Sequence, residues 1–181
     1  MFSFGKKKEE INITDIVFIS VAAKWHACME AFKQEPKTVF ITWFEDTQQQ
    51  LQSFFTQQNI TGAEIILYRQ SASHFISNKQ VIFAEHYPMR DKEINLYKSL
   101  NLAALKVFSC LEDALFQYFG GNNLIEMLQK MGMSENEPLQ HPMIAAALKN
   151  AQEKIASKVS LEQTVRSQTE WFSRNLPPHK E

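Results

Sequence analysis

The chain has 181 residues, of which 44% are apolar, enough for one domain of about 150 residues with an appendage. Nineteen Lys and Arg residues against twenty Asp and Glu residues give a formal net charge of −1, which disfavours a dedicated nucleic-acid binder, because such proteins carry surplus positive charge. No apolar run approaches the ~20 residues that cross a bilayer, and no apolar stretch follows the charged start as in a secretory signal, so we expect a cytoplasmic globular protein without membrane insertion.

Strand-like and helix-like patterns alternate along the first 110 residues. Short β-branched and aromatic runs predict five strands, at residues 16–20, 38–44, 64–68, 80–84 and 104–108. Helices are predicted between these strands, namely Val21 to Pro36, a Gln-rich helix opened by a capping box of Asp46 and Gln49, and Pro88 to Leu100. The alternation predicts a mainly parallel five-stranded sheet with helices on both faces.

The last third of the chain has a helical pattern. A second capping box, Ser109 with Glu112, predicts a helix that ends at Gly120-Gly121, and another short helix reaches Gly132. A loop over 133–142 precedes a long helix that buries residues from Met143 to Val159. A third capping box, Ser160 with Gln163, predicts a new helix whose apolar stripe includes Leu161, Val165, Trp171 and Leu176. We expect a flexible tail over 1–12, including the basic run Lys6–Lys8, an α/β domain over 13–133 and a helical extension over 134–181.

Glycine and aspartate usage bears on nucleotide chemistry. Phosphate-cradling loops need several glycines in a short window, because backbone N–H groups must approach the anion closely. The chain has five glycines and neither of the phosphate-loop signatures, and its four aspartates form no acidic box for Mg²⁺. We expect no ATP hydrolysis and no tight binding of ATP by the chain alone.

One candidate acid–base pair follows a predicted strand. Glu85-His86-Tyr87 lies just past the strand over 80–84, where open α/β sheets place their ligand crevice, so Glu85 and His86 could exchange protons with a ligand. The residue types favour the plainer interpretation, a solvated turn between a strand and a helix.

Histidines and cysteines give no metal or nucleophile pattern. His26 and His74 have no partner at metal-ligand spacing, so no metal site is expected. Cys28 lies on the apolar face of its helix and is expected to be inert packing. Cys110 lies near a predicted helix start, where a thiol pKa can fall, but burial as a small residue is favoured.

A series of motifs in the C-terminal third resembles the SecA preprotein translocase ATPase family. These motifs are Leu111-Glu-Asp-Ala-Leu-Phe116, Phe119-Gly120, Met131-Gly-Met133, Glu137-Pro-Leu139, His141-Pro-Met-Ile144 and Asn150-Ala-Gln-Glu-Lys-Ile155. They resemble the stretch where the second nucleotide-binding domain of SecA enters its helical scaffold. Upstream, residues 15–20, 39–42 and 81–86 with Arg90 are similar to earlier parts of that domain. The resemblance implies a RecA-like, P-loop NTPase-type three-layer fold for 13–133 and a scaffold-like extension after it.

Departures from the family fall in the segments that would handle nucleotide. Residues 69–79 are short where the family carries a Gly- and Asp-containing helicase motif. The family's Gly-Arg-Ser-Gly-Arg finger segment falls near Leu96-Tyr-Lys-Ser-Leu-Asn101, which has no arginine and no glycine. A lysine is a poor substitute for an arginine finger, because only the guanidinium presents a fixed bidentate cation. A degenerate, non-enzymatic copy of the domain is therefore expected.

Three functions remain open at this point. The first is a SecA-like domain that acts through protein–protein contacts, by self-association or with an export-pathway component. The second is a nucleotide-binding half-site, in which Arg90 and Lys98 supply positive charge in trans to an ATP held by a partner; Glu85, His86, Arg90 and Lys98 are then the candidate cofactor-binding residues. The third is a helicase-derived RNA-binding module, which the balanced charge disfavours. No cofactor is expected for the chain alone.

Overall fold

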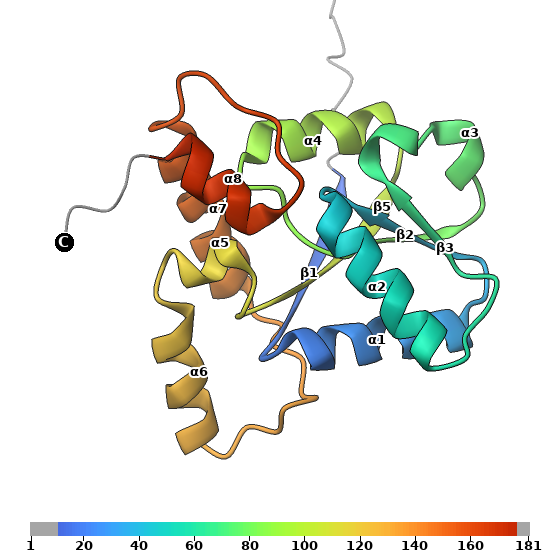
Figure 1. Cartoon of the computed structure of the whole chain (residues 1–181), viewed down its shortest axis with the longest axis horizontal. Helices are drawn as coiled ribbons and strands as arrows, with labels where there is room; N and C mark the ends of the chain where they lie inside the picture. Colours follow the sequence, from blue (N-terminus) through green and yellow to red (C-terminus); the bar gives the residue numbers. More distant parts are fainter. Residues whose placement is uncertain (1–10, 177–181) are drawn as a thin grey trace, which may run out of the picture.

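The sheet is the centre of the molecule. The computed structural model describes residues 11–176. Five strands lie in the order β1-β5-β4-β2-β3, and every pairing between neighbours is parallel. Their bounds are β1 (Asn12–Phe18), β2 (Thr38–Thr42), β3 (Glu64–Leu67), β4 (Gln80–Phe83) and β5 (Ala104–Cys110). The predicted parallel five-stranded sheet is confirmed (Figure 1).

Two helices, α1 (Val21–Gln34) and α2 (Glu45–Gln57), cover one face of this sheet. Their apolar residues share a core with alternate strand residues, because successive side chains of a strand point to opposite faces. The members of this core include Trp25, Cys28, Leu51, Phe55, Phe40, Ile82 and Phe108. Cys28 is thus a core residue, as the sequence indicated.

Helices also cover the opposite face of the sheet. These are α3 (Ser73–Ile76), α4 (Arg90–Ser99), α7 (Pro142–Ala156) and α8 (Gln168–Asn175), with a short 3-10 turn at Tyr68–Gln70. Their core includes Ile41, Phe83, Val107, Tyr97, Leu148, Ile155, Trp171 and Leu176. The result is a three-layer α/β/α, RecA-like fold, and the C-terminal helices pack back onto the domain that precedes them (Figure 1).

Two short helices join β5 to the extension, α5 (Ala114–Gln117) and α6 (Gly121–Lys130). Two glycines make the break between these helices. Gly120 has a φ of 86°, which favours glycine, and a Cβ on Gly121 would lie 2.6 Å from the carbonyl oxygen of Leu111. After α6, Leu139 exchanges backbone hydrogen bonds with Val17, which ties the extension to the free edge of β1.

Two of the three predicted capping boxes are wrong in this half of the chain. Ser109 lies inside β5, and α5 begins only after Asp113. The segment over 157–167 forms no helix, and α8 begins after Ser167, whose side chain accepts a hydrogen bond from the Glu170 N–H. Leu161, expected in an apolar stripe, is 83% exposed. The tail over 1–10 with Lys6–Lys8 lies outside the described residues, and the boundary between 133 and 134 stays a prediction.

Candidate functional site

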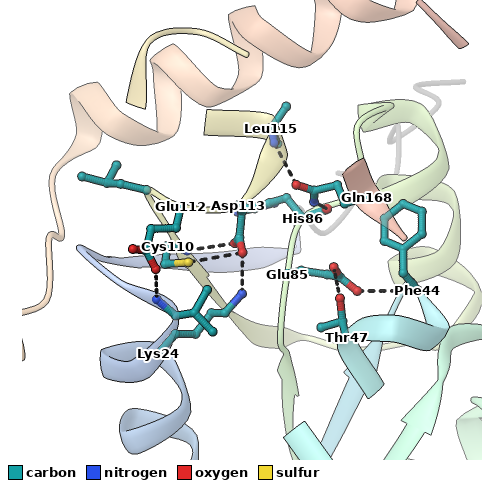
Figure 2. A network of polar contacts seen from close by, with 12 residues as sticks. Lys24, Phe44, Thr47, Glu85, His86, Cys110, Glu112, Asp113, Leu115 and Gln168 are labelled. Carbon is teal, nitrogen blue, oxygen red and sulfur yellow. Dashed lines mark hydrogen bonds and ion pairs between the residues drawn. The ribbon is translucent and has the colours of Figure 1, made fainter. Parts of the chain in front are cut away.

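Glu85 lies at the carboxyl end of β4, the sheet edge where open α/β folds bind ligands. It is 2% exposed. Its carboxylate accepts hydrogen bonds from the backbone N–H groups of Trp43 (2.9 Å) and Phe44 (3.0 Å) and from the Thr47 hydroxyl (2.6 Å). Figure 2 shows the contacts with Phe44 and Thr47. Glu85 therefore ties the end of β4 to the two residues that precede α2 and to Thr47 in its first turn. The capping box predicted for Asp46 is wrong, because α2 begins at Glu45 without a side-chain cap of its own.

Burial raises the pKa of Glu85 from 4.5 to about 7, although the charge of Lys24 and the hydrogen bonds from Thr47 and Phe44 oppose the shift. A carboxyl group whose pKa is higher in the folded state stabilises the fold at low pH, and this contribution is lost as the pH rises through the folded pKa. The free energy of unfolding should therefore fall by about 3 kcal/mol between pH 4.5 and pH 8 on account of Glu85.

Glu85→Gln should remove this part of the pH dependence. The amide keeps an oxygen for the two backbone N–H groups and carries no charge to bury. We compare the unfolding free energy of the variant with that of the wild type at each pH. This difference should be about 3 kcal/mol more favourable to the variant at pH 8 than at pH 4.5. Urea denaturation across this range measures it, and two parallel pH curves would contradict the pKa assigned to Glu85.

His86 is held between two carboxylates. Its Nδ1 lies 3.0 Å from Glu93 Oε1, its Nε2 lies 3.3 Å from Asp15 Oδ1, and its side chain is 3% exposed. Burial alone would lower the pKa of His86, but the neighbouring charges of Glu93 and Asp15 raise it to about 10. The ring is therefore an imidazolium at neutral pH. The expectation of a solvated turn is wrong, because residues distant in sequence cover both Glu85 and His86.

Two glutamines complete the cover over this turn. Gln152 of α7 donates one side-chain amide to both Glu93 (2.8 Å) and the Tyr87 carbonyl (2.7 Å). Gln168 of α8 donates to the His86 carbonyl (2.9 Å) and accepts from a backbone N–H of α5 (Figure 2). One feature of the sequence could have indicated that a polar side chain of α7 is buried here. Gln152 interrupts the apolar stripe of its helix between Leu148 and Ile155 and is fully buried.

A buried ion pair joins α1 to the end of β5. Lys24 Nζ lies 2.6 Å from Asp113 Oδ1, and the Lys24 side chain is 2% exposed. The other oxygen of Asp113 accepts from the Cys110 N–H (2.9 Å) (Figure 2). Burial raises the pKa of Cys28 to about 12 and also raises that of Cys110, and both thiols are buried. This agrees with their interpretation as packing residues rather than nucleophiles.

The remaining candidates do not converge on one place. Arg90, at the start of α4, is half-buried and points its guanidinium at Gln152, with 3.5 Å between Nη1 and Oε1. Lys98 is exposed in the last turn of the same helix. His26 and His74 are exposed as well. Across residues 11–176, no group of three or more His, Cys, Asp or Glu side chains is arranged to hold a metal ion.

A second feature of the carboxyl edge is an aromatic cavity of about 140 Å³. The rings that line it are Trp43, Phe44, Tyr68, Tyr87 and Trp171, from the ends of β2, β3 and β4 and from α8. Trp43 packs between Tyr68 and Tyr87, with ring centroids 4.9 and 4.8 Å away. Residues 157–167, which we call the cover segment, close this cavity with Glu162, Thr164 and Val165.

A third feature is an apolar groove of about 190 Å³ between α5, α6 and α7. Its walls include Val17, Leu115, Leu124, Ile144 and Leu148. Phe119 lines it and is 45% exposed. Exposed methionines lie on or at the end of two of its wall helices, namely Met127 (50%) in α6, Met131 (75%) just after α6 and Met143 (73%) in α7. Contiguous exposed apolar surface of this kind marks contact sites for other proteins, and methionine is common on such surfaces because it adapts its shape.

No helix within residues 11–176 combines the length and apolar character that crossing a membrane requires.

Comparison with known proteins finds similarity in one segment of the chain. No protein-family model matches the chain. Over 53 residues, 29% of this chain, it is 45% identical to the protein translocase subunit SecA of Bartonella tribocorum and 43% identical to that of Bartonella henselae. The SecA of Buchnera aphidicola subsp. Schizaphis graminum is 34% identical over the same length. The matched segment spans 6% of the length of each of these relatives, so the chain is SecA-like in part.

Proposed function

We propose that the chain is a non-catalytic, SecA-like protein that works through contacts with other proteins in protein export. In this proposal it is a degenerate form of the second nucleotide-binding domain of SecA with the start of the helical scaffold. The partial identity to translocase subunits supports the link to export. The RecA-like sheet supports the relation to a nucleotide-binding domain.

The observation that carries the proposal is the apolar groove between α5, α6 and α7. Phe119 lines it and is 45% exposed, and Met127 and Met143, 50% and 73% exposed, lie on α6 and α7, the helices that form two of its walls. Burying such side chains against a partner is favourable by about 25 cal/mol for each Å² removed from water. Binding a partner through this groove would remove these apolar side chains from water, which folding of the chain alone does not do.

The geometry at the carboxyl edge of the sheet supports the proposal that the chain is non-catalytic. A catalytic acid or base needs a polar atom within hydrogen-bond reach of a substrate. Here Glu85 is committed to Trp43, Phe44 and Thr47, and His86 lies between two carboxylates. Both groups therefore act as structural ties between the strand ends and the surrounding helices.

Met127→Glu should abolish partner binding without harming the fold, because a charge inside an apolar interface must be desolvated. The measurement is affinity capture with the purified chain from native cytosol, followed by reconstitution with the identified partner and calorimetry. We expect the wild type to bind and Met127→Glu to lose at least about 2 kcal/mol of binding free energy.

Phe75→Glu is the matched control, since Phe75 is a large apolar residue of α3, 37% exposed and outside the groove. It should bind like the wild type. A partner that both variants retain would place the contact elsewhere. A second purification step removes contaminating ATPases. Multiple-turnover hydrolysis of ATP that persists after this step would contradict the proposal that the chain is non-catalytic.

A further inference from the structure

The cover segment places a carboxylate in a receptor built by the rest of the protein. Glu162 Oε1 accepts hydrogen bonds from the Tyr87 hydroxyl and from Trp171 Nε1, the latter at 2.7 Å, and Oε2 pairs with Lys92 Nζ. These donors come from three places: the turn after β4, α8 and α4. None of them belongs to the cover segment itself.

The receptor favours an ionised carboxylate. Burial raises the pKa of Glu162, but the hydrogen bonds from Lys92, Tyr87 and Trp171 outweigh it, so the pKa lies below its usual value. The Glu162 side chain is only 13% exposed. Charge-assisted hydrogen bonds of this kind are stronger than those between neutral groups.

The attachment of the cover segment combines polar contacts with two partly buried valines, Val159 and Val165, whereas α8 is anchored in the core by a fully buried side chain. Arg166 binds Glu45 through its guanidinium (3.0 Å) and accepts from the Asp46 N–H through its carbonyl (3.0 Å). In contrast, Trp171 is 1% exposed and belongs to the main core. Polar contacts at a surface exchange readily with water or with another ligand, so the cover segment can leave while α8 stays.

Resting on the proposed function as a protein-binding domain, we propose that Tyr87, Lys92 and Trp171 form a carboxylate-binding site that Glu162 occupies in the free protein and that an acidic peptide segment of a partner takes over. Displacing the cover segment would bare the rings of Trp43, Tyr68 and Tyr87 beside the cations of Arg69 and Lys92. Among the lining residues Glu45 would remain as an anion, paired with Arg69 at 2.6 Å, which leaves the Lys92 ammonium for an incoming carboxylate. This surface complements a peptide that carries a carboxylate next to apolar side chains.

The test uses the chain's own segment as the probe. A fluorescent peptide of residues 158–167, and the same peptide with Gln at position 162, are titrated into the full-length chain by anisotropy. Glu162→Ala vacates the receptor, and we expect it to bind the natural peptide about tenfold more tightly than the wild type does. We expect the Gln peptide to bind Glu162→Ala about tenfold more weakly than the natural one.

Control variants separate the receptor from general charge effects. Lys92→Met in the Glu162→Ala background should remove the preference for the natural peptide. Glu153→Gln, an exposed carboxylate of α7 paired only loosely with Lys149, should behave like the wild type. If Glu162→Ala unfolds, Glu162→Gln replaces it, because the amide keeps an acceptor for Tyr87.

Equal binding of both peptides, or equal binding to wild type and Glu162→Ala, would overturn the proposal. These outcomes leave the groove between α5, α6 and α7 untouched, since none of its lining residues takes part. A failure here is therefore distinct from a failure of the Met127→Glu test.

Discussion

Trp171→Ala should lower the free energy of unfolding by about 4 kcal/mol, the usual range for removing a buried tryptophan. Trp171 is 1% exposed and packs edge-on against Tyr87, with 6.2 Å between ring centroids. Its indole N–H also donates to Glu162. The substitution thus leaves a cavity under α8 and removes one of the two hydrogen bonds that Glu162 Oε1 accepts, while the bond from the Tyr87 hydroxyl remains. Urea denaturation followed by far-UV circular dichroism measures the change.

Trp171→Phe is the matched control, because it keeps an aromatic ring in the core and loses the hydrogen bond. Its cost should be about 2 kcal/mol. If Trp171→Ala instead stayed within about 1 kcal/mol of the wild type, α8 would not contribute to the core as described, and the C-terminal segment would fold independently of the sheet.

The sheet could be predicted because its signals are local. The runs at 38–44, 64–68 and 80–84 consist of residues that suit buried strands, and β2, β3 and β4 fall within them. The first strand differs, since β1 runs from Asn12 to Phe18 and not from 16 to 20. Pairing with β5 over all seven positions recruits polar residues such as Asn12 and Thr14, which no apolar pattern marks.

The environment of Glu85 and His86 could not be predicted in the same way. The sequence predicts the turn after β4. The residues that bury this turn are distant in sequence: Gln168 lies 82 residues beyond His86, and Gln152 lies 59 residues beyond Glu93. Local residue preference treats Glu and His as exposed types. Only tertiary packing makes them a buried network, because each new partner satisfies a polar group that would otherwise be costly to bury.

The predicted starts of helices were wrong for a related reason. A Ser, Thr or Asp followed three residues later by Glu or Gln predicts a capping box, yet α2 begins at Glu45, before Asp46, and Glu85 binds the two N–H groups that precede the helix. Ser109 satisfies the same pattern while lying in β5. A short local motif cannot compete with strand pairing or with contacts that distant segments make at the start of the helix, such as the bond from the Asp46 N–H to the Arg166 carbonyl.

The buried pair of Lys24 and Asp113 gives the second large prediction. Asp113→Asn should cost about 3 kcal/mol, because it leaves the Lys24 ammonium, 2% exposed, without a counter-charge. The charge of Asp113 raises the pKa of Lys24 although burial alone would lower it, so the ammonium persists in the wild type. The amide can still accept from the Cys110 N–H, which confines the loss to the charge.

The double variant Lys24→Met with Asp113→Asn should recover to within about 1 kcal/mol of the wild type, since replacing a buried ion pair by neutral groups of similar size is often nearly neutral. Lys24→Met alone should cost less than Asp113→Asn, because Asp113 is more exposed than Lys24, at 12% against 2%, and keeps the Cys110 N–H. Urea denaturation of the four proteins at neutral pH gives the coupling energy. Additive costs would mean that the two charges do not interact, and α1 would then be held to β5 by apolar packing alone.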